Sequence, residues 1–299
     1  MIRKKTISLE FNEFLKSLFL LMKPRVMSLV IFTCAVGFLT SNSDKSFLDS
    51  IISIALVAVG AGAAGCLNMW YESDLDALMT RTCLRPIPTG KVNKKQALIF
   101  GVFLSIISVL ALNYFSNFLS AFLLFFTIFF YIFIYTIWLK RKTPQNIVIG
   151  GAAGALPPVI GWTIATNAIS LEPLAYFFII FVWTPSHFWA LSLYKTDDYK
   201  KAKIPMLPLT DGIEKTKVYI FVYSLLMLPV IIFPYLIGFV DFVYLVPALI
   251  LTIYYNIICY DLYNYKKNKF ELKKAKKVFS YSILYLFLIF VLFLIDKLI

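Results

Sequence analysis

Acidic and amide side chains at a spacing of four residues distinguish the segment from Asn68 to Pro86. Asn68, Glu72 and Asp76 follow the apolar stretch AGAAGCL in the sequence NMWYESDLDALMTRTCLRP. On one continuous α-helix, steps of four residues rotate by about 400°, so the three side chains would form one ladder along a helix face. Asp74 would point away from this ladder. Carboxylate and amide oxygens are hard ligands that suit Mg²⁺, which proteins bind through one or two carboxylates plus substrate phosphates.

A second acidic segment, FVWTPSHFWALSLYKTDDYKKAKIPMLP, begins at Phe181. His187, Tyr194 and Asp198 lie at positions i, i+7 and i+11, so one continuous helix would carry them within about 20° of one another. We therefore predict an aromatic and ionisable stripe that ends in Asp198. His187 is the only histidine of the chain. A single buried histidine is either a hydrogen-bonded core residue or a functional group, and the sequence leaves both interpretations open.

Arginines follow the first acidic segment and indicate what the acids would hold. Arg81 and Arg85 carry planar guanidinium groups, which bind phosphate oxygens in pairs. Acids, arginines and aromatic residues together fit a lipid diphosphate, with its head on Mg²⁺ and its tail among helices. Metal and basic groups would stabilise departing pyrophosphate, and aromatic faces would stabilise an allylic cation. The alternative is an ordinary helix end with solvated acids.

The elements that must position these groups are membrane-spanning helices. The chain has 299 residues, of which 60% are hydrophobic, and a mean hydropathy of +0.80, whereas a soluble domain is about 45–50% apolar. Apolar runs long enough to cross a bilayer as helices recur along the whole chain, without the short alternation typical of barrel strands. The basic segment 1–20 has no cleavage site and is predicted to stay cytoplasmic. We predict spans at 21–40, 47–67, 96–113, 117–139, 146–166, 173–194, 218–238, 242–262 and 279–296.

The long polar connections follow the second and sixth predicted spans, on the same side of the membrane. This arrangement predicts an all-α, polytopic membrane bundle of about nine transmembrane helices. Two four-helix halves would be related by a weak internal repeat, with one extra helix added at the end. Because no long linker interrupts the pattern, residues 1–299 are predicted to form a single integral-membrane domain.

The distribution of charge explains the net charge of +13. With the N-terminus inside, 27 of the 29 Lys and Arg residues fall in cytoplasmic segments, and only Lys45 and Lys297 fall outside. This positive-inside pattern predicts a cytoplasmic N-terminus and an external C-terminus. The basic residues therefore indicate orientation and contact with membrane lipid rather than a nucleic-acid partner. The four cysteines lack paired spacing, and a single histidine excludes a His-rich metal site.

Taken together, the motifs resemble the UbiA-type intramembrane prenyltransferases. The resemblance covers roughly residues 20–265. Within the family, the branch that prenylates haem is the most similar, because the chain combines RT..RP, PP..GW, HFWAL and DDY...IPML. The stretches that carry the resemblance are KPRV (Lys23–Val26), NMWYESDLDALMTRTCLRP, GGAAGALPPVIGW (Gly150–Trp162) and WTPSHFWALSLYKTDDYKKAKIPMLP (Trp183–Pro208).

The resemblance implies a membrane enzyme that joins the farnesyl group of farnesyl diphosphate to a vinyl group of haem B, giving haem O and pyrophosphate. It implies Mg²⁺ as cofactor, a bacterial inner-membrane location with the active site on the cytoplasmic side, and a downstream haem A synthase as a candidate partner. The implied metal and diphosphate residues are Asn68, Glu72, Asp76 and Asp198, which form the catalytic set with Tyr194. Implied contacts to the diphosphate, the haem propionates or the porphyrin come from Lys23, Arg25, Arg81, Arg85, His187, Lys195 and Asp197.

Three positions depart from the family pattern. Glu72 stands where Asp is usual, so the ion would sit slightly differently. Lys203 stands where Gly is usual, which affects the expected turn. Tyr194 replaces the first Asp of the second motif in the wider family, and this leaves fewer carboxylates for a second Mg²⁺.

Two alternative functions remain from the sequence. The first is prenyl transfer to an aromatic quinone precursor, against which Tyr194 and the HFWAL stretch argue. The second is a membrane transporter, which would need ionisable residues near mid-membrane that are reached from both sides. Here the acids and bases crowd one face instead.

Overall fold

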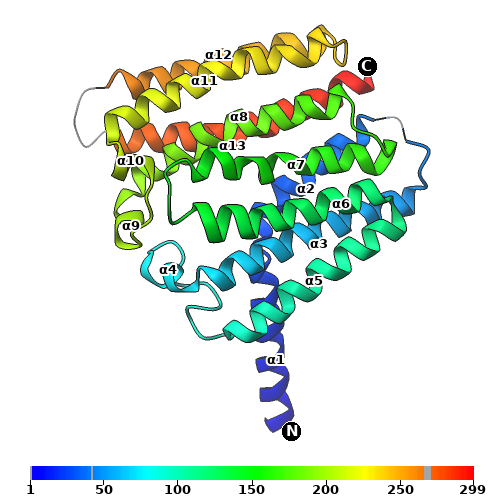
Figure 1. The fold of residues 1–299 in the computed structure, drawn as a ribbon, viewed down its shortest axis with the longest axis vertical. Coiled ribbons are helices and arrows are strands. Elements are labelled where there is room, and N and C mark those ends of the chain that lie inside the picture. The colour runs from blue at the N-terminus through cyan, green and yellow to red at the C-terminus, as the bar shows by residue number, and fades with distance from the viewer. Residues whose placement is uncertain (1, 42, 266–270) are drawn as a thin grey trace.

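The structure, a computed structural model, describes residues 2–41, 43–265 and 271–299, and every regular element in this part of the chain is a helix (Figure 1). A long helix stands at each of the nine predicted spans, so the all-α membrane bundle is confirmed. These helices are α2 (Pro24–Leu39), α3 (Phe47–Tyr71), α5 (Lys94–Phe115), α6 (Phe118–Phe129) with its π-helical continuation η1 (Phe130–Leu139), α7 (Asn146–Thr166), α8 (Leu171–Tyr194), α11 (Ile213–Leu236), α12 (Phe242–Tyr263) and α13 (Glu271–Leu298).

The first span differs from the others because it is bent. The helix α1 (Ile2–Leu21) precedes α2, and Asn12–Leu21 makes an angle of 53° with α2. Eight described helices are long and apolar enough to cross a membrane by themselves, and this bent pair brings the number to as many as nine. The chain is therefore a multi-span membrane protein.

Three short helices lie in the two long polar connections. They are α4 (Ser73–Leu78), α9 (Thr196–Lys201) and α10 (Leu207–Thr210). Figure 1 shows all three at the same end of the bundle, as the sequence predicts for these connections. The connection between the predicted spans 242–262 and 279–296 lies partly outside the described residues, and the internal repeat stays a prediction.

Buried apolar side chains hold the helices together in two main clusters. In the first, α7 packs with the helices that precede it in the chain. In the second, α7 and α8 pack with α11, α12 and α13. Leu67, Leu124 and Ile160 are examples from the first cluster, and Tyr176, Tyr255 and Phe290 from the second.

Helices α2 and α7 approach each other closely at two glycines. A Cβ atom on Gly161 would collide with the backbone carbonyl oxygen of Cys34, and one on Gly37 would collide with that of Pro158. Backbone atoms cannot move aside as the end of a flexible side chain can. The close contact between the first and fifth spans therefore requires glycine at positions 37 and 161.

The Gly161→Ala variant is expected to lower the free energy of unfolding by roughly 1–3 kcal/mol, the usual cost of overpacking. Thermal unfolding in detergent measures this effect. Gly154→Ala is the matched control, because Gly154 lies on the same helix and a Cβ atom added there would meet no other atom within 4 Å. Equal unfolding midpoints for the two variants would contradict the close packing of α2 on α7.

Candidate functional site

The first acidic segment is not one continuous helix, so the predicted ladder is interrupted. Helix α3 ends at Tyr71 and α4 begins at Ser73, with Glu72 between them at φ −92° and ψ 10°. Asn68 belongs to α3, Glu72 lies at the break itself, and Asp76 belongs to α4. The prediction that Asn68, Glu72 and Asp76 share one helix is therefore wrong.

The second acidic segment breaks in the same way. Helix α8 ends at Tyr194 and α9 begins at Thr196, with Lys195 between them at φ −117° and ψ 22°. His187 and Tyr194 do share a face of α8, because both rings contact Phe279, at centroid distances of 4.6 and 5.7 Å. Asp198 lies beyond the break, so the prediction of one helical stripe from His187 to Asp198 is wrong at its end.

The helix dipole gives a physical reason for both breaks. Carboxylates are disfavoured at the C-terminal end of a helix and favoured in the first turn of a new one. Asp74 and Asp76 lie in the first turn of α4, and Asp197 and Asp198 lie in the first turn of α9. Starting a short helix thus moves the acids from an unfavourable helix end to a favourable one.

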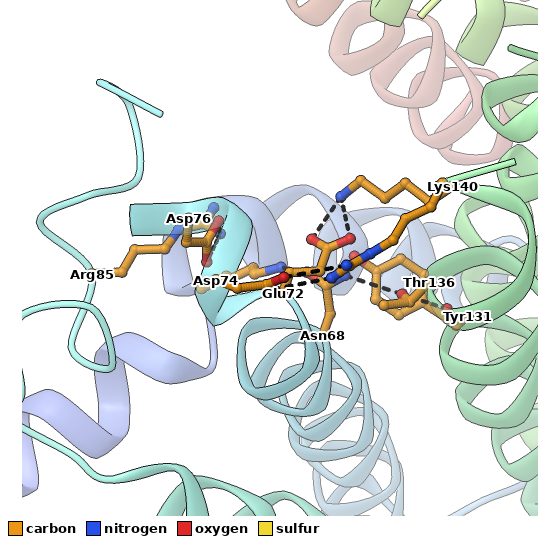
Figure 2. Close-up of polar contacts among 10 residues, drawn as sticks. Asn68, Glu72, Asp74, Asp76, Arg85, Tyr131, Thr136 and Lys140 are labelled. Atoms are coloured by element: carbon orange, nitrogen blue, oxygen red, sulfur yellow. Dashed lines mark hydrogen bonds and ion pairs between the residues drawn. The ribbon is translucent and has the colours of Figure 1, made fainter. Parts of the chain in front are cut away.

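Glu72 is buried and paired with a lysine that the sequence motifs do not include. Its side chain is 5% exposed, and Lys140 Nζ lies 2.6 Å from both carboxylate oxygens (Figure 2). Lys140 donates a hydrogen bond to Oε2, while Oε1 has no hydrogen-bond donor of good geometry. The Glu72 carboxylate is therefore neutralised by Lys140, which lies against both of its oxygens. Burial lowers the pKa of Lys140, but the nearby Glu72 carboxylate raises it. The net shift of this pKa is upward.

Asn68 is held between two elements. Its Oδ1 accepts a hydrogen bond of 2.5 Å from Lys23 Nζ, and its Nδ2 donates to Thr136 Oγ1 at 3.0 Å. Thr136 belongs to η1 and donates to the carbonyl of Tyr131, five residues earlier, at 2.8 Å. Lys23 has a left-handed backbone, with φ 53°. Strained backbone and π-helical turns both occur often at functional sites, and here both face Asn68.

Asp76 forms a separate ion pair on the α4 side. Arg85 Nη1 lies 2.8 Å from both carboxylate oxygens of Asp76. Figure 2 shows this pair apart from the pair formed by Glu72 and Lys140. The described residues give no acceptor to the other N–H groups of Arg85, so these can bind an anion. Asp74 takes no part in this pair and instead pairs with Arg141 at the surface.

Asp198 joins the two acidic segments. Thr80, in the connection after α4, donates from Oγ1 to both oxygens of Asp198 at 2.9 and 2.8 Å, and from its backbone N–H at 3.3 Å. Burial raises the pKa of the Asp198 carboxyl and the Thr80 hydrogen bonds lower it, with a net downward shift. Asp198 is therefore an anion at neutral pH.

Five further predicted residues are half-buried or exposed. Lys195 and Tyr194 are half-buried, with Lys195 Nζ 6.0 Å from the Tyr194 ring centroid. The side chains of Arg25, Arg81 and Asp197 are exposed and form no ion pair with a described residue. Lys203 has φ 52°, the left-handed conformation that favours glycine.

Three polar residues of the site were not predicted from the sequence, namely Lys140, Thr80 and Thr136. Lys140 entered only the count of positive charges that gives the topology. The useful signal would have been the cost of a buried acid, since a carboxylate inside the bundle needs a cationic partner. Thr80 and Thr136 carry no pattern of their own, because their partners are distant in the sequence.

The donor set fits Mg²⁺, although it does not form a complete metal cage. Glu72, Asp76, Asp198 and Asn68 offer only hard oxygen ligands, and Glu72 Oε1 accepts no hydrogen bond, although Lys140 Nζ lies 2.6 Å away. Within the described residues, no three His, Cys, Asp or Glu side chains lie close enough to enclose a metal ion. A site of this kind suits an ion that is completed by the phosphate oxygens of a substrate.

Comparison with known proteins points to one family. The model of the UbiA prenyltransferase family matches residues 29–284. Protoheme IX farnesyltransferase of Pelagibacter ubique is 72% identical over 94% of this chain and 92% of its own length. Protoheme IX farnesyltransferase 2 of Mesorhizobium japonicum is 50% identical over 93% of this chain and 89% of its own length.

Solved structures share the fold at low identity. The structure of a digeranylgeranylglyceryl phosphate synthase has a TM-score of 0.78 at 17% identity, covering 95% of this chain and 99% of that chain. A UbiA homologue from Archaeoglobus fulgidus, bound to DMAPP and Mg²⁺, has a TM-score of 0.67 at 16% identity, covering 92% and 99%. That protein binds its prenyl diphosphate together with a divalent metal.

Proposed function

The chain belongs to the UbiA prenyltransferase family, and we infer that it transfers the farnesyl group of farnesyl diphosphate to a vinyl group of haem B. The products are haem O and pyrophosphate. One observation carries the chemistry: two acid-bearing helix breaks, joined by Asp198 and Thr80, bring buried carboxylates and half-buried cations to one end of the bundle. The relatives that carry the farnesyltransferase name support haem as the acceptor over a quinone precursor.

We propose that Asn68, Glu72, Asp76 and Asp198 hold Mg²⁺ together with the diphosphate. The ion, when bound, would neutralise the charge that develops on the leaving pyrophosphate. Lys140 and Arg85 now neutralise Glu72 and Asp76. With the carboxylates on the metal, these cations are free to donate to phosphate oxygens instead, so the buried charges stay paired in both states.

The arriving diphosphate would also meet Lys23, which donates to Asn68, and other basic residues. We assign diphosphate or propionate contacts to Lys23, Arg25, Arg81 and Lys195, with Asp197 beside them. We also assign to the Tyr194 ring the stabilisation of an allylic cation. The bond between the farnesyl carbon and the diphosphate oxygen breaks, the vinyl group attacks that carbon, and the new carbocation takes up water with loss of a proton.

We further propose the cellular setting from the charge pattern. The enzyme would lie in the bacterial inner membrane as one domain over residues 1–299, with the N-terminus and the site on the cytoplasmic side and the C-terminus outside. Membrane lipid would surround the bundle, and a haem A synthase would receive the product. No nucleic-acid partner is expected.

The proposed function is tested by offering two acceptors to the purified protein. Farnesyl diphosphate and Mg²⁺ are supplied with equal amounts of haem B and 4-hydroxybenzoate, and the products are identified by mass spectrometry. We expect farnesylated haem alone. Prenylated 4-hydroxybenzoate without haem product would favour the quinone-precursor alternative. Full activity of the Asp76→Ala variant would argue against the site itself.

The Glu72→Gln variant is expected to raise the Mg²⁺ concentration for half-maximal activity by at least about tenfold, because an amide is a weaker ligand than a carboxylate. A half-saturation value does not depend on how much of the protein is folded. Asp74→Asn is the control, since Asp74 is exposed and paired with Arg141. Unchanged Mg²⁺ dependence in Glu72→Gln would place Glu72 outside the metal shell.

A further inference from the structure

His187 is fixed in one position by Trp183 of its own helix α8 and by residues of α13. Its side chain is 7% exposed, and its ring is sandwiched between Trp183 and Phe279. The centroid distances are 4.2 and 4.6 Å, and the planes are inclined by 18° and 25°. Trp183 in turn donates from Nε1 to the carbonyl of Ser282 at 2.9 Å. The imidazole therefore cannot rotate without displacing two aromatic rings.

The hydrogen bonds around His187 assign its neutral tautomer. Ser282 Oγ lies 2.7 Å from the carbonyl oxygen of Phe279 and 2.6 Å from His187 Nδ1. Two oxygens at that separation need a hydrogen between them, and only the serine hydroxyl can supply it. The hydrogen between Ser282 and His187 must then come from Nδ1. This leaves the lone pair on Nε2, for which no described residue serves as a hydrogen-bond partner.

This arrangement is the one that proteins use to prepare a metal-binding imidazole. Metal-ligating histidines donate their other N–H to an oxygen, which sets the tautomer and the ring orientation. A core histidine held only for stability would be expected to use both nitrogens. His187 lies seven residues from Tyr194 on the face they share, a rise of about 10 Å along the helix, a distance that a macrocycle with reactive groups on its rim can bridge.

We propose that His187 Nε2 is an axial ligand to the iron of the porphyrin acceptor, and that Ser282 is the positioning residue that prepares it. This inference rests on the proposed function, since it takes an iron porphyrin as the acceptor. If the proposal holds, the enzyme selects a metalloporphyrin over an aromatic acid through the contact between His187 on α8 and Ser282 on α13. Tyr194 and Phe279 continue the same aromatic surface toward the acidic site.

Ligation is tested without farnesyl diphosphate, by titrating the purified protein in detergent with ferric haem B and with iron-free protoporphyrin IX. The wild type should bind haem more tightly by at least about tenfold, and its reduced complex should show the iron–histidine stretching band in resonance Raman spectra. His187→Ala should lose that band, and added imidazole should restore ligation. Equal affinity for the two porphyrins, or an unchanged band in His187→Ala, would overturn the proposal.

Ser282→Ala is expected to weaken haem binding by about 10–100-fold, the usual effect of removing an outer partner of a metal ligand. Ser282→Thr, which keeps the hydroxyl, should bind as the wild type does. Ser186→Ala is the matched control, because Ser186 is a buried serine beside His187 whose hydroxyl faces Tyr255 and the carbonyl of Trp183. Equal effects of Ser186→Ala and Ser282→Ala would overturn the positioning role.

Product formation in the same samples separates this proposal from the proposed function. If the wild type makes farnesylated haem and His187→Ala keeps the ligation spectrum, the role of His187 as the iron ligand is overturned. The proposed transferase function then stands. Wild-type protein that shows the His187-dependent band but forms no farnesylated haem supports the ligand and overturns the transferase assignment.

Discussion

Replacing Asp198 by Asn is expected to lower the rate of farnesyl transfer by about 10²–10³-fold, the size of effect seen when one preorganised electrostatic contact is lost. Asn keeps the shape of the side chain, and its carbonyl can still accept the hydrogen bond from Thr80. The loss should therefore appear in the turnover rate at saturating Mg²⁺, while the unfolding temperature stays near that of the wild type.

The matched control for Asp198 is Asp74→Asn. Both substitutions remove one carboxylate from a short helix at the same end of the bundle, but Asp74 is exposed and paired with Arg141 at 3.0 Å. We expect nearly wild-type turnover for Asp74→Asn. Similar losses in both variants would show that the overall charge of this end matters and that Asp198 has no special role.

Replacing Lys140 by Met is expected to destabilise the protein by about 3–5 kcal/mol, because it leaves the Glu72 carboxylate buried without a cation. The double variant Lys140→Met with Glu72→Gln should recover most of that loss, since no uncompensated charge then remains. The free energy of unfolding is measured in mixed detergent micelles for the wild type, the single variant and the double variant. A single variant that costs less than about 1 kcal/mol would contradict a buried ion pair.

The neighbouring residue Arg141 provides the control for Lys140. Arg141 also pairs with an acid of this segment, Asp74, but both partners are largely exposed. Exposed ion pairs contribute about 0–1 kcal/mol, so Arg141→Met should change stability by no more than that. The contrast between two adjacent residues tests whether burial decides the energetic effect.

Hydropathy was sufficient to predict the nine spans and the side of the bundle where the acids gather, because a bilayer-spanning helix requires a long apolar run. The helix breaks at Glu72 and Lys195 could not be predicted in this way. Projection at 100° per residue assumes a continuous helix, whereas acids at a helix C-terminus favour a new helix start. The periodicity therefore grouped Asp76 with Asn68, although Asp76 pairs with Arg85.

The site residues that the sequence missed depend on contacts between distant elements. Lys140 reaches Glu72 across 68 positions of the chain, and Ser282 reaches His187 across 95. Periodicity on one helix carries no information about such partners. The requirement that buried charges be neutralised does predict that Glu72 needs a cation, but not which one.

The most direct test of the account is a structure of the protein with Mg²⁺ and a non-reactive farnesyl diphosphate analogue. The separation to measure is that between Lys140 Nζ and the Glu72 carboxylate, now 2.6 Å. We predict that it lengthens, with Lys140 on a phosphate oxygen and carboxylate oxygens of Glu72, Asp76 or Asp198 about 2.0–2.1 Å from the ion. A bound diphosphate with Lys140 still on Glu72, and no metal on these carboxylates, would contradict it.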